Sequence, residues 1–248
     1  MDRFAPIVSD SIFTTSILFD ASVNAGVIPL RFAMELGSTF DAVSKDVTVL
    51  NVYLKLFNQL FTTEESVQKL NDAANVATGL VQRSLLDGMV LRVARLTDRA
   101  SSNTPRGNVE NLTFANLLEN LPGETDELRQ ELEPQLDTIN DKVAPFREWR
   151  HQMLAHSDKA AFMNDGDLLD GFSKTDLDSL VKLFSQFLNT INRHYNDSAT
   201  LYEYVNFVGG GEELLNVLGF GLKYLDLQEE AIQGSITPER LLQEIRGF

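Results

Sequence analysis

The sequence predicts an all-α protein built around a four-helix bundle. Apolar residues recur at three- and four-residue steps over four long stretches, and helix-capping signals stand at the start of several of them. The apolar–polar alternation typical of β-strands is absent. With 43% hydrophobic and 23% charged residues in 248, the composition is that of a packed globular protein, which excludes disorder throughout the chain.

The first two long helices are predicted between about residues 41 and 99. The apolar stripe of the first helix comprises Val49, Val52, Tyr53, Leu56, Phe57, Leu60 and Phe61. Thr62 and Glu65 stand three residues apart, as in a capping box, and open the second helix. Residues 100–107 have loop chemistry, and a short amphipathic segment follows at 112–121.

A third helical pattern runs from about Leu128 to Ala155 and contains Pro134 and Pro145. Each proline removes a backbone amide and crowds the preceding turn, which predicts a kink or break at each position. The fourth helix opens at Ser173, which stands three residues before Asp176 in another capping pattern.

The C-terminal part of the chain is predicted to be helical as well. Gly209–Gly211 is interpreted as a hinge before a helix from Glu212 to Leu225, and Thr237 is the expected N-cap of a last helix. The predicted organisation is therefore an N-terminal extension (1–40), a helical bundle (41–200) and a C-terminal helical extension (201–248).

Charge and composition exclude several classes of function. The chain has 21 Lys and Arg against 36 Asp and Glu, a formal net charge of −15, so any site for nucleic acid has to be local. Without cysteine there is no disulfide framework, thiolate nucleophile or Cys-ligated zinc. The N-terminus lacks the basic region of a signal peptide, and every apolar stretch is interrupted before about 18 residues. We therefore expect a cytoplasmic protein without a membrane span.

Two of the three histidines, His151 and His156, lie in one short segment together with the single tryptophan and Arg150. Histidine takes and gives a proton near neutral pH, and arginine offers a fork of donors that matches a phosphate. A pair of this kind can cleave RNA without a metal. The His removes the proton from the ribose 2′-OH or protonates the leaving 5′-oxygen, and the Arg stabilises the charge that develops on the phosphate in the transition state.

Local positive charge supports a site for a polyanion at this segment. Arg92, Arg95 and Arg99 share one face of the second helix. Three further basic residues approach the segment along the third helix: Lys142, Arg147 and Arg150. Together they predict a basic cleft for RNA, with Asp98 supporting Arg95 or a residue of the segment through a charge-assisted hydrogen bond. The alternative for Arg92, Arg95 and Arg99 is a solvated helix flank in which they pair with Asp87 and Asp98.

The string Arg-His-Gln-Met-Leu-Ala-His at 150–156, followed by Ser-Asp, resembles the R-(polar)-x4-H motif of the HEPN superfamily. Together with the preceding helix that ends in Arg-Leu-Thr-Asp-Arg at 95–99, it resembles the abortive-infection (AbiU-like) branch over about residues 41–200. This resemblance implies a HEPN-type bundle that dimerises around a shared cleft and acts as a metal-independent endoribonuclease. Arg150 and His156 would be the catalytic pair. His151 would hold the supporting polar position, where Asn is the commonest residue.

The spacing of this pair poses a geometric question. Six residues on a regular helix advance by about 600°, which leaves Arg150 and His156 about 120° apart around the axis. Either the long Arg side chain reaches round, or the helix loosens near Ser157, or one cleft uses groups from both subunits. The sequence leaves all three open.

The expected partners are an RNA substrate, a second copy of the chain and an antitoxin or other regulatory protein, with a toxin or antiphage role implied by the resemblance. No cofactor or metal site is predicted, because His151 and His156 lie on different faces of a regular helix and the acidic loop at 165–170 lacks the glycine and glutamate of a calcium loop. The alternative function is a non-catalytic module that binds RNA, a nucleotide or a protein.

Overall fold

The computed structural model describes residues 34–105, 107–122, 125–151, 171–206 and 208–246. The elements in chain order are α1 (Met34–Phe61), α2 (Glu64–Leu96), β1 (Ser101–Thr104), β2 (Gly107–Glu110), α3 (Phe114–Glu119), α4 (Asp126–Lys142), α5 (Ala144–Trp149), α7 (Lys174–Asn196), α8 (Gly211–Ile232) and α9 (Pro238–Arg246). Helices dominate this part of the chain, which confirms the predicted fold class.

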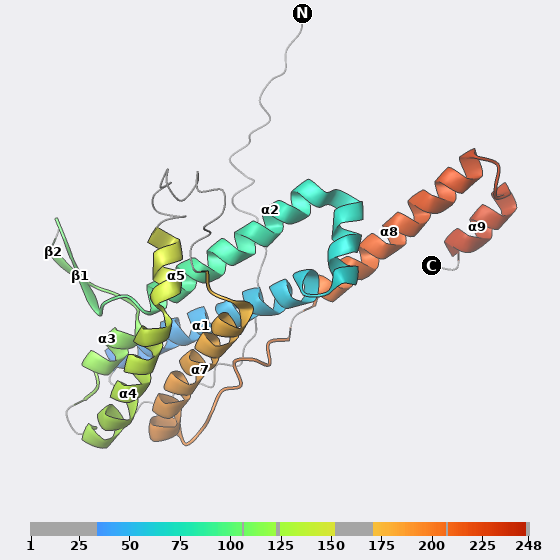
Figure 1. Cartoon of the computed structure of the whole chain (residues 1–248). Helices are drawn as coiled ribbons and strands as arrows, with labels where there is room; N and C mark the ends of the chain where they lie inside the picture. Colours follow the sequence, from blue (N-terminus) through green and yellow to red (C-terminus); the bar gives the residue numbers. More distant parts are fainter. Residues whose placement is uncertain (1–33, 106, 123–124, 152–170, 207, 247–248) are drawn as a thin grey trace, which may run out of the picture.

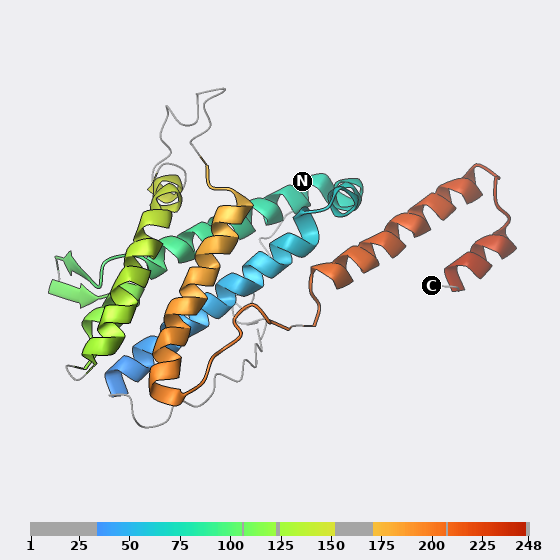
Figure 2. The same cartoon turned by 60° about the horizontal axis from the view of Figure 1, so that its bottom comes forward.

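The bundle consists of α1, α2, α4 and α7 (Figures 1 and 2). Helix α1 packs against α2 and α7, and α4 packs against α7. Between them lie fully buried aromatic side chains: Phe114 of the short helix α3 contacts Phe184 and Phe187 of α7, with ring centroids 4.7 and 5.2 Å away. This apolar core fixes the helices whose ends form the site described below.

Capping residues mark the starts of two bundle helices. At α7 the predicted capping box is present: the Asp176 amide donates to the Ser173 hydroxyl at 3.1 Å, and the Ser173 amide donates to the Asp176 carboxylate at 2.8 Å. At α2 the predicted pair was displaced by one residue. Thr63 is the N-cap and accepts from the Ser66 amide at 3.1 Å, whereas the Thr62 hydroxyl donates to a carbonyl in the last turn of α1.

The two prolines of the third helical pattern behave differently. Pro145 stands in the first turn of α5, directly after α4 ends at Lys142, so the predicted break occurs there. Helix α4 runs through Pro134 without interruption. The break at Pro145 starts a separate short helix, and this helix leads to Arg150.

Strands β1 and β2 pair antiparallel as a hairpin, where the sequence indicated a loop over residues 100–107. Ser101 pairs with Glu110, and the strands are four residues each, too short and too polar to show an alternating pattern. The side chain of Asn111 ties the base of the hairpin by donating to the Arg99 carbonyl at 2.9 Å and to the Ser102 hydroxyl at 2.8 Å. The hairpin thus depends on local polar contacts.

Helix α8 continues to Ile232, beyond the predicted end at Leu225, and projects away from the bundle in both views (Figures 1 and 2). Its first turn is joined to α1, because the Gly211 amide donates to the Gln59 side chain at 3.0 Å and a Cβ at Gly211 would lie 2.8 Å from the Gln59 Cβ. The predicted N-cap of the last helix is present, with Thr237 accepting from the Arg240 amide at 3.3 Å. No helix in the described ranges has the length and apolar character needed to cross a membrane.

Candidate functional site

Aromatic packing fixes the short helix that carries Arg150. Phe146 of α5 is buried and stacks on Phe172 with centroids 4.2 Å apart, and Trp149 meets the same ring edge-on at 5.7 Å. Arg150 keeps helical angles (φ −55°, ψ −46°), and with His151 it forms a wider π-helical turn after α5. These contacts hold α5 against the segment that leads into α7, and α5 also contacts α2.

Beside this turn lies an open groove of about 470 Å³. It is lined by residues of α1, the C-terminal half of α2 and the turn after α5: Tyr53, Gly88, Leu91, Arg92, Arg95, Asp98 and Arg150. The lining therefore combines three guanidinium groups and one carboxylate with the apolar surface of Tyr53 and Leu91. A groove with this lining suits a ligand that combines anionic and flat apolar parts.

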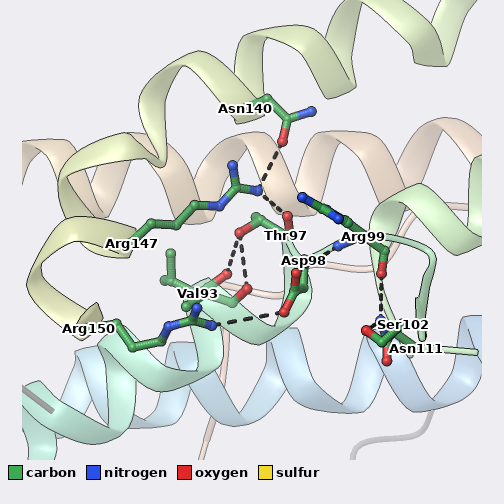
Figure 3. A network of polar contacts seen from close by, with 10 residues as sticks. Val93, Thr97, Asp98, Arg99, Ser102, Asn111, Asn140, Arg147 and Arg150 are labelled. Atoms are coloured by element: carbon green, nitrogen blue, oxygen red, sulfur yellow. Dashed lines mark hydrogen bonds and ion pairs between the residues drawn. The ribbon is translucent and has the colours of Figure 1, made fainter. Parts of the chain in front are cut away.

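Arg150 points towards Asp98 (Figure 3), and both residues line the groove. Its Nη1 lies 3.9 Å from Asp98 Oδ2, and its side chain is 39% exposed. Asp98 is oriented by the backbone of the next residue, because the Arg99 amide donates to Asp98 Oδ1 at 2.9 Å. An exposed ion pair at this distance contributes little energy, so the Arg150 guanidinium is available to an incoming anion.

Arg92 and Arg95 share one carboxylate of α1. Arg92 Nη1 lies 2.7 Å from Asp46 Oδ1, and Arg95 Nη2 donates to Asp46 Oδ2. Asp46 is largely covered, with 19% of its side chain exposed, whereas the Arg95 side chain is 58% exposed. The shared carboxylate fixes both guanidinium groups along α2 and leaves most of Arg95 facing solvent.

Tyr53 and Gly88 form the floor of the groove where α1 crosses α2. A Cβ at position 88 would lie 2.5 Å from Tyr53 Cε1, so the ring needs a glycine there. The Arg92 guanidinium lies 5.2 Å from the centroid of the same ring, within the range of a cation–π contact. Asp46 and Tyr53 are seven residues apart on one face of α1, but their relation to the arginines depends on how α1 and α2 pair, which the sequence pattern did not reveal.

Arg147 serves a different purpose from Arg150, three residues away. Its guanidinium donates to the Thr97 carbonyl at the end of α2 and to Asn140 Oδ1 at 3.2 Å (Figure 3). Burial lowers the pKa of Arg147, Asp98 opposes this shift, and the positive charge of Arg150 adds to it. Arg147 therefore clamps α4 and α5 onto the C-terminal end of α2, where the helix dipole favours a cation.

The other predicted basic residues lie outside the groove lining. Arg99 follows the end of α2 at Leu96, so it does not continue the helix face of Arg92 and Arg95. Lys142 acts on the start of α7, where its charge helps to lower the pKa of Asp176. Arg92, Arg95 and Arg150 thus line the groove together, whereas Arg99, Arg147 and Lys142 are not part of its lining.

The structure describes one of the two histidines of the motif. His151 is exposed beside Arg150. His156 lies outside the described residues, so the three geometric alternatives for its approach to Arg150 stay open. Asp98, predicted as a supporting residue, faces Arg150, while Arg95 takes Asp46 as its carboxylate partner.

A family model described as AbiU2, of the HEPN superfamily, matches residues 34–213 of the chain. The chain belongs to the HEPN AbiU2 family. The match confirms the resemblance drawn from the motif and identifies an abortive-infection HEPN-type module, and it takes in both α1 and the groove. No curated protein and no solved structure matches the chain.

Proposed function

We propose that this HEPN AbiU2 protein is a metal-independent endoribonuclease that cleaves single-stranded or loop RNA in a cleft at a homodimer interface. The observation that carries the proposal is Arg150, which follows the short helix α5, lines the groove and lies 3.9 Å from Asp98, its ion-pair partner among the described residues. Arg95, exposed along the same groove, offers a second donor for an adjacent phosphate. In the cell, the enzyme acts as an antiphage or toxin effector with an antitoxin or regulatory partner.

In the proposed reaction the ribose 2′-oxygen attacks phosphorus and the bond from phosphorus to the 5′-oxygen breaks. His156 takes the proton from the 2′-OH or gives one to the leaving 5′-oxygen. Arg150 stabilises the additional negative charge on the phosphoryl oxygens in the transition state. The products are a 2′,3′-cyclic phosphate and a 5′-hydroxyl. Asp98 keeps the Arg150 guanidinium at the groove until the phosphate replaces it.

The alternative function is a module that binds RNA, a nucleotide or a protein without cutting. It is favoured by the fact that Asp46 neutralises part of the charge of Arg92 and Arg95, and that Arg150 already has a carboxylate partner. The two functions differ in whether Arg150 is needed for a chemical step or only for affinity.

The test is cleavage of a mixed cellular RNA pool by the purified protein in EDTA. We expect cleavage that survives EDTA and falls at least about 100-fold in Arg150→Ala and in His156→Ala, the lower range for removing an acid–base or charge-stabilising group. Arg193→Ala and His194→Ala, exposed residues in the last turns of α7, are matched controls that should keep full activity. An inert wild type that is folded and dimeric, or variants as active as wild type, would favour the binding module.

A further inference from the structure

The groove combines charged side chains with uncharged surface, and Tyr53, Gly88 and Leu91 contribute the uncharged part. We call these three residues the apolar lining. Leu91 is 48% exposed, and Tyr53 is partly exposed. A phosphate gains little from apolar surface, whereas an unstacked nucleobase gains from covering its flat faces. The apolar lining therefore indicates a ligand with a flat apolar part next to its anionic part.

The packing of α1 on α2 places the apolar lining beside Arg92. Gly88, Leu91 and Arg92 stand at positions i, i+3 and i+4, so they share one side of α2. Tyr53 reaches this side from α1, because a Cβ at position 88 would lie 2.5 Å from its Cε1 atom, and the Arg92 guanidinium lies 5.2 Å from its ring centroid. The tyrosine ring, the leucine and the guanidinium therefore lie on the same side of α2.

Arg92 differs from the other two arginines of the groove. Its side chain is 24% exposed, compared with 58% for Arg95 and 39% for Arg150. Two partners hold its guanidinium: the Asp46 carboxylate at 2.7 Å and the Tyr53 ring. A guanidinium that is held in this way attracts a phosphate less strongly, but its planar group can still stack on a base. The more exposed Arg95 and Arg150 are better placed to bind phosphate.

We propose that the groove holds one unstacked nucleotide of the RNA, with its base against Tyr53, Leu91 and Arg92 and a phosphate at Arg95 and Arg150. The groove volume of about 470 Å³ is within the range of roughly 300–1,000 Å³ for sites that take a small organic ligand. This base site, which rests on the proposed function, gives the enzyme a preference for unpaired over duplex RNA. In an A-form duplex the bases are stacked and paired, so their faces are not available to the apolar lining.

Binding of two probes with equal charge and unequal base content tests the base site. One probe is a labelled single-stranded RNA about 12 nucleotides long, and the other is a ribose–phosphate chain of the same length without bases. Both carry 2′-O-methyl groups, which prevent attack by the 2′-oxygen, and fluorescence anisotropy is recorded in EDTA with the full-length protein. We expect Tyr53→Leu to weaken binding of the RNA about tenfold, as for the loss of one base stack, and to leave binding of the base-free chain unchanged.

Two matched variants accompany Tyr53→Leu. Tyr53→Phe keeps the aromatic ring and should bind the RNA like the wild type. Tyr224→Leu removes a tyrosine that is 44% exposed on α8, outside the groove lining, and should bind both probes like the wild type. The same RNA annealed to its complement should bind more weakly than the single strand, and equally to the wild type and to Tyr53→Leu.

Tyr53 also packs against the core, so a second variant tests the site at an exposed position. Leu91→Ala shortens a half-exposed side chain and should weaken binding of the RNA about threefold, because part of the apolar contact is lost. Binding of the base-free chain should not change. Circular dichroism checks that each variant keeps the helix content of the wild type.

Wild-type affinity for the RNA in both Tyr53→Leu and Leu91→Ala would overturn the base site. Equal losses on the RNA and on the base-free chain would overturn it as well, because Tyr53 would then only position Arg92. Cleavage of unmodified RNA in EDTA is measured on the same proteins. Cleavage combined with base-independent binding would reject the base site and leave the nuclease intact, whereas base-dependent binding without cleavage would reject the nuclease alone.

Discussion

The groove region and helix α8 expose different kinds of side chain: charged ones at the groove and apolar ones on α8. Around the groove, each described arginine of the lining has an acidic partner in the same chain, with Asp46 serving two and Asp98 serving Arg150. On α8, apolar side chains such as Val217 and Ile232 remain exposed. The charged side chains of the groove are therefore paired within the described part of the chain, whereas the apolar side chains of α8 are not covered there. Each prediction below tests one side of this comparison.

The largest difference is expected between two leucines. Leu96, the last residue of α2, is fully buried, while Leu225 on α8 is more than half exposed. Leu96→Ala should lower the free energy of unfolding by about 2–5 kcal/mol, because it removes buried apolar volume and leaves a cavity. Leu225→Ala should change it by less than about 0.5 kcal/mol in the monomer. Urea unfolding at low protein concentration measures both, and equal losses would contradict the contrast.

Two arginines in the groove region should separate stability from activity. Arg147→Met removes the donor to the Thr97 carbonyl and is expected to cost about 1–3 kcal/mol of unfolding free energy. Arg150→Met breaks the exposed ion pair with Asp98 and should cost less than about 1 kcal/mol. In the cleavage assay the order reverses, with Arg150→Met the more damaging. If Arg150→Met destabilised the fold as much as Arg147→Met, Arg150 would be a structural residue.

Glycines from the two regions should respond to alanine with opposite signs. Gly88→Ala drives a Cβ into the Tyr53 ring, which should destabilise the protein by about 1–3 kcal/mol and displace the floor of the groove. Gly221 on α8 has no atom within 4 Å of its position for a Cβ, so Gly221→Ala should stabilise this helix by up to about 1 kcal/mol through helix propensity. Thermal unfolding of both variants decides the signs.

The sequence predicted the helix starts and the helix break that depend on local chemistry. Ser173 with Asp176, Pro145 and Thr237 act within one turn of their own helix, so their patterns were sufficient. Thr62 and Thr63 have the same side-chain chemistry, so the sequence did not show which of them caps α2. The Thr62 hydroxyl bonds to a carbonyl in the last turn of α1, and Thr63 is the N-cap.

The sequence predicted the residues of the motif but not the contacts that other helices make with the site. Arg150 and Asp98 were named from the sequence, and the structure brings them together. The partnership of Arg92 and Arg95 with Asp46 was not predictable, because it links residues more than forty positions apart through the packing of α1 on α2. The same limit applies to α8, whose exposed stripe looks like any amphipathic helix until its surroundings are known.

The smallest expected effect concerns Asp176, in the first turn of α7. The hydrogen bond from the Ser173 hydroxyl lowers the pKa of Asp176 below its ordinary value of 3.8, followed by the bond from the Ser173 amide and, more weakly, by the charge of Lys142. Because the folded pKa is depressed, the stabilising contribution of Asp176 is complete above about pH 4 and is lost as the pH falls through the lower folded value. Titration of the carboxyl carbon by NMR should show the pKa rising most in Ser173→Ala and less in Lys142→Gln. An unchanged pKa in Lys142→Gln would mean that Lys142 does not act on α7, and would return this residue to consideration as a contact for RNA at the groove.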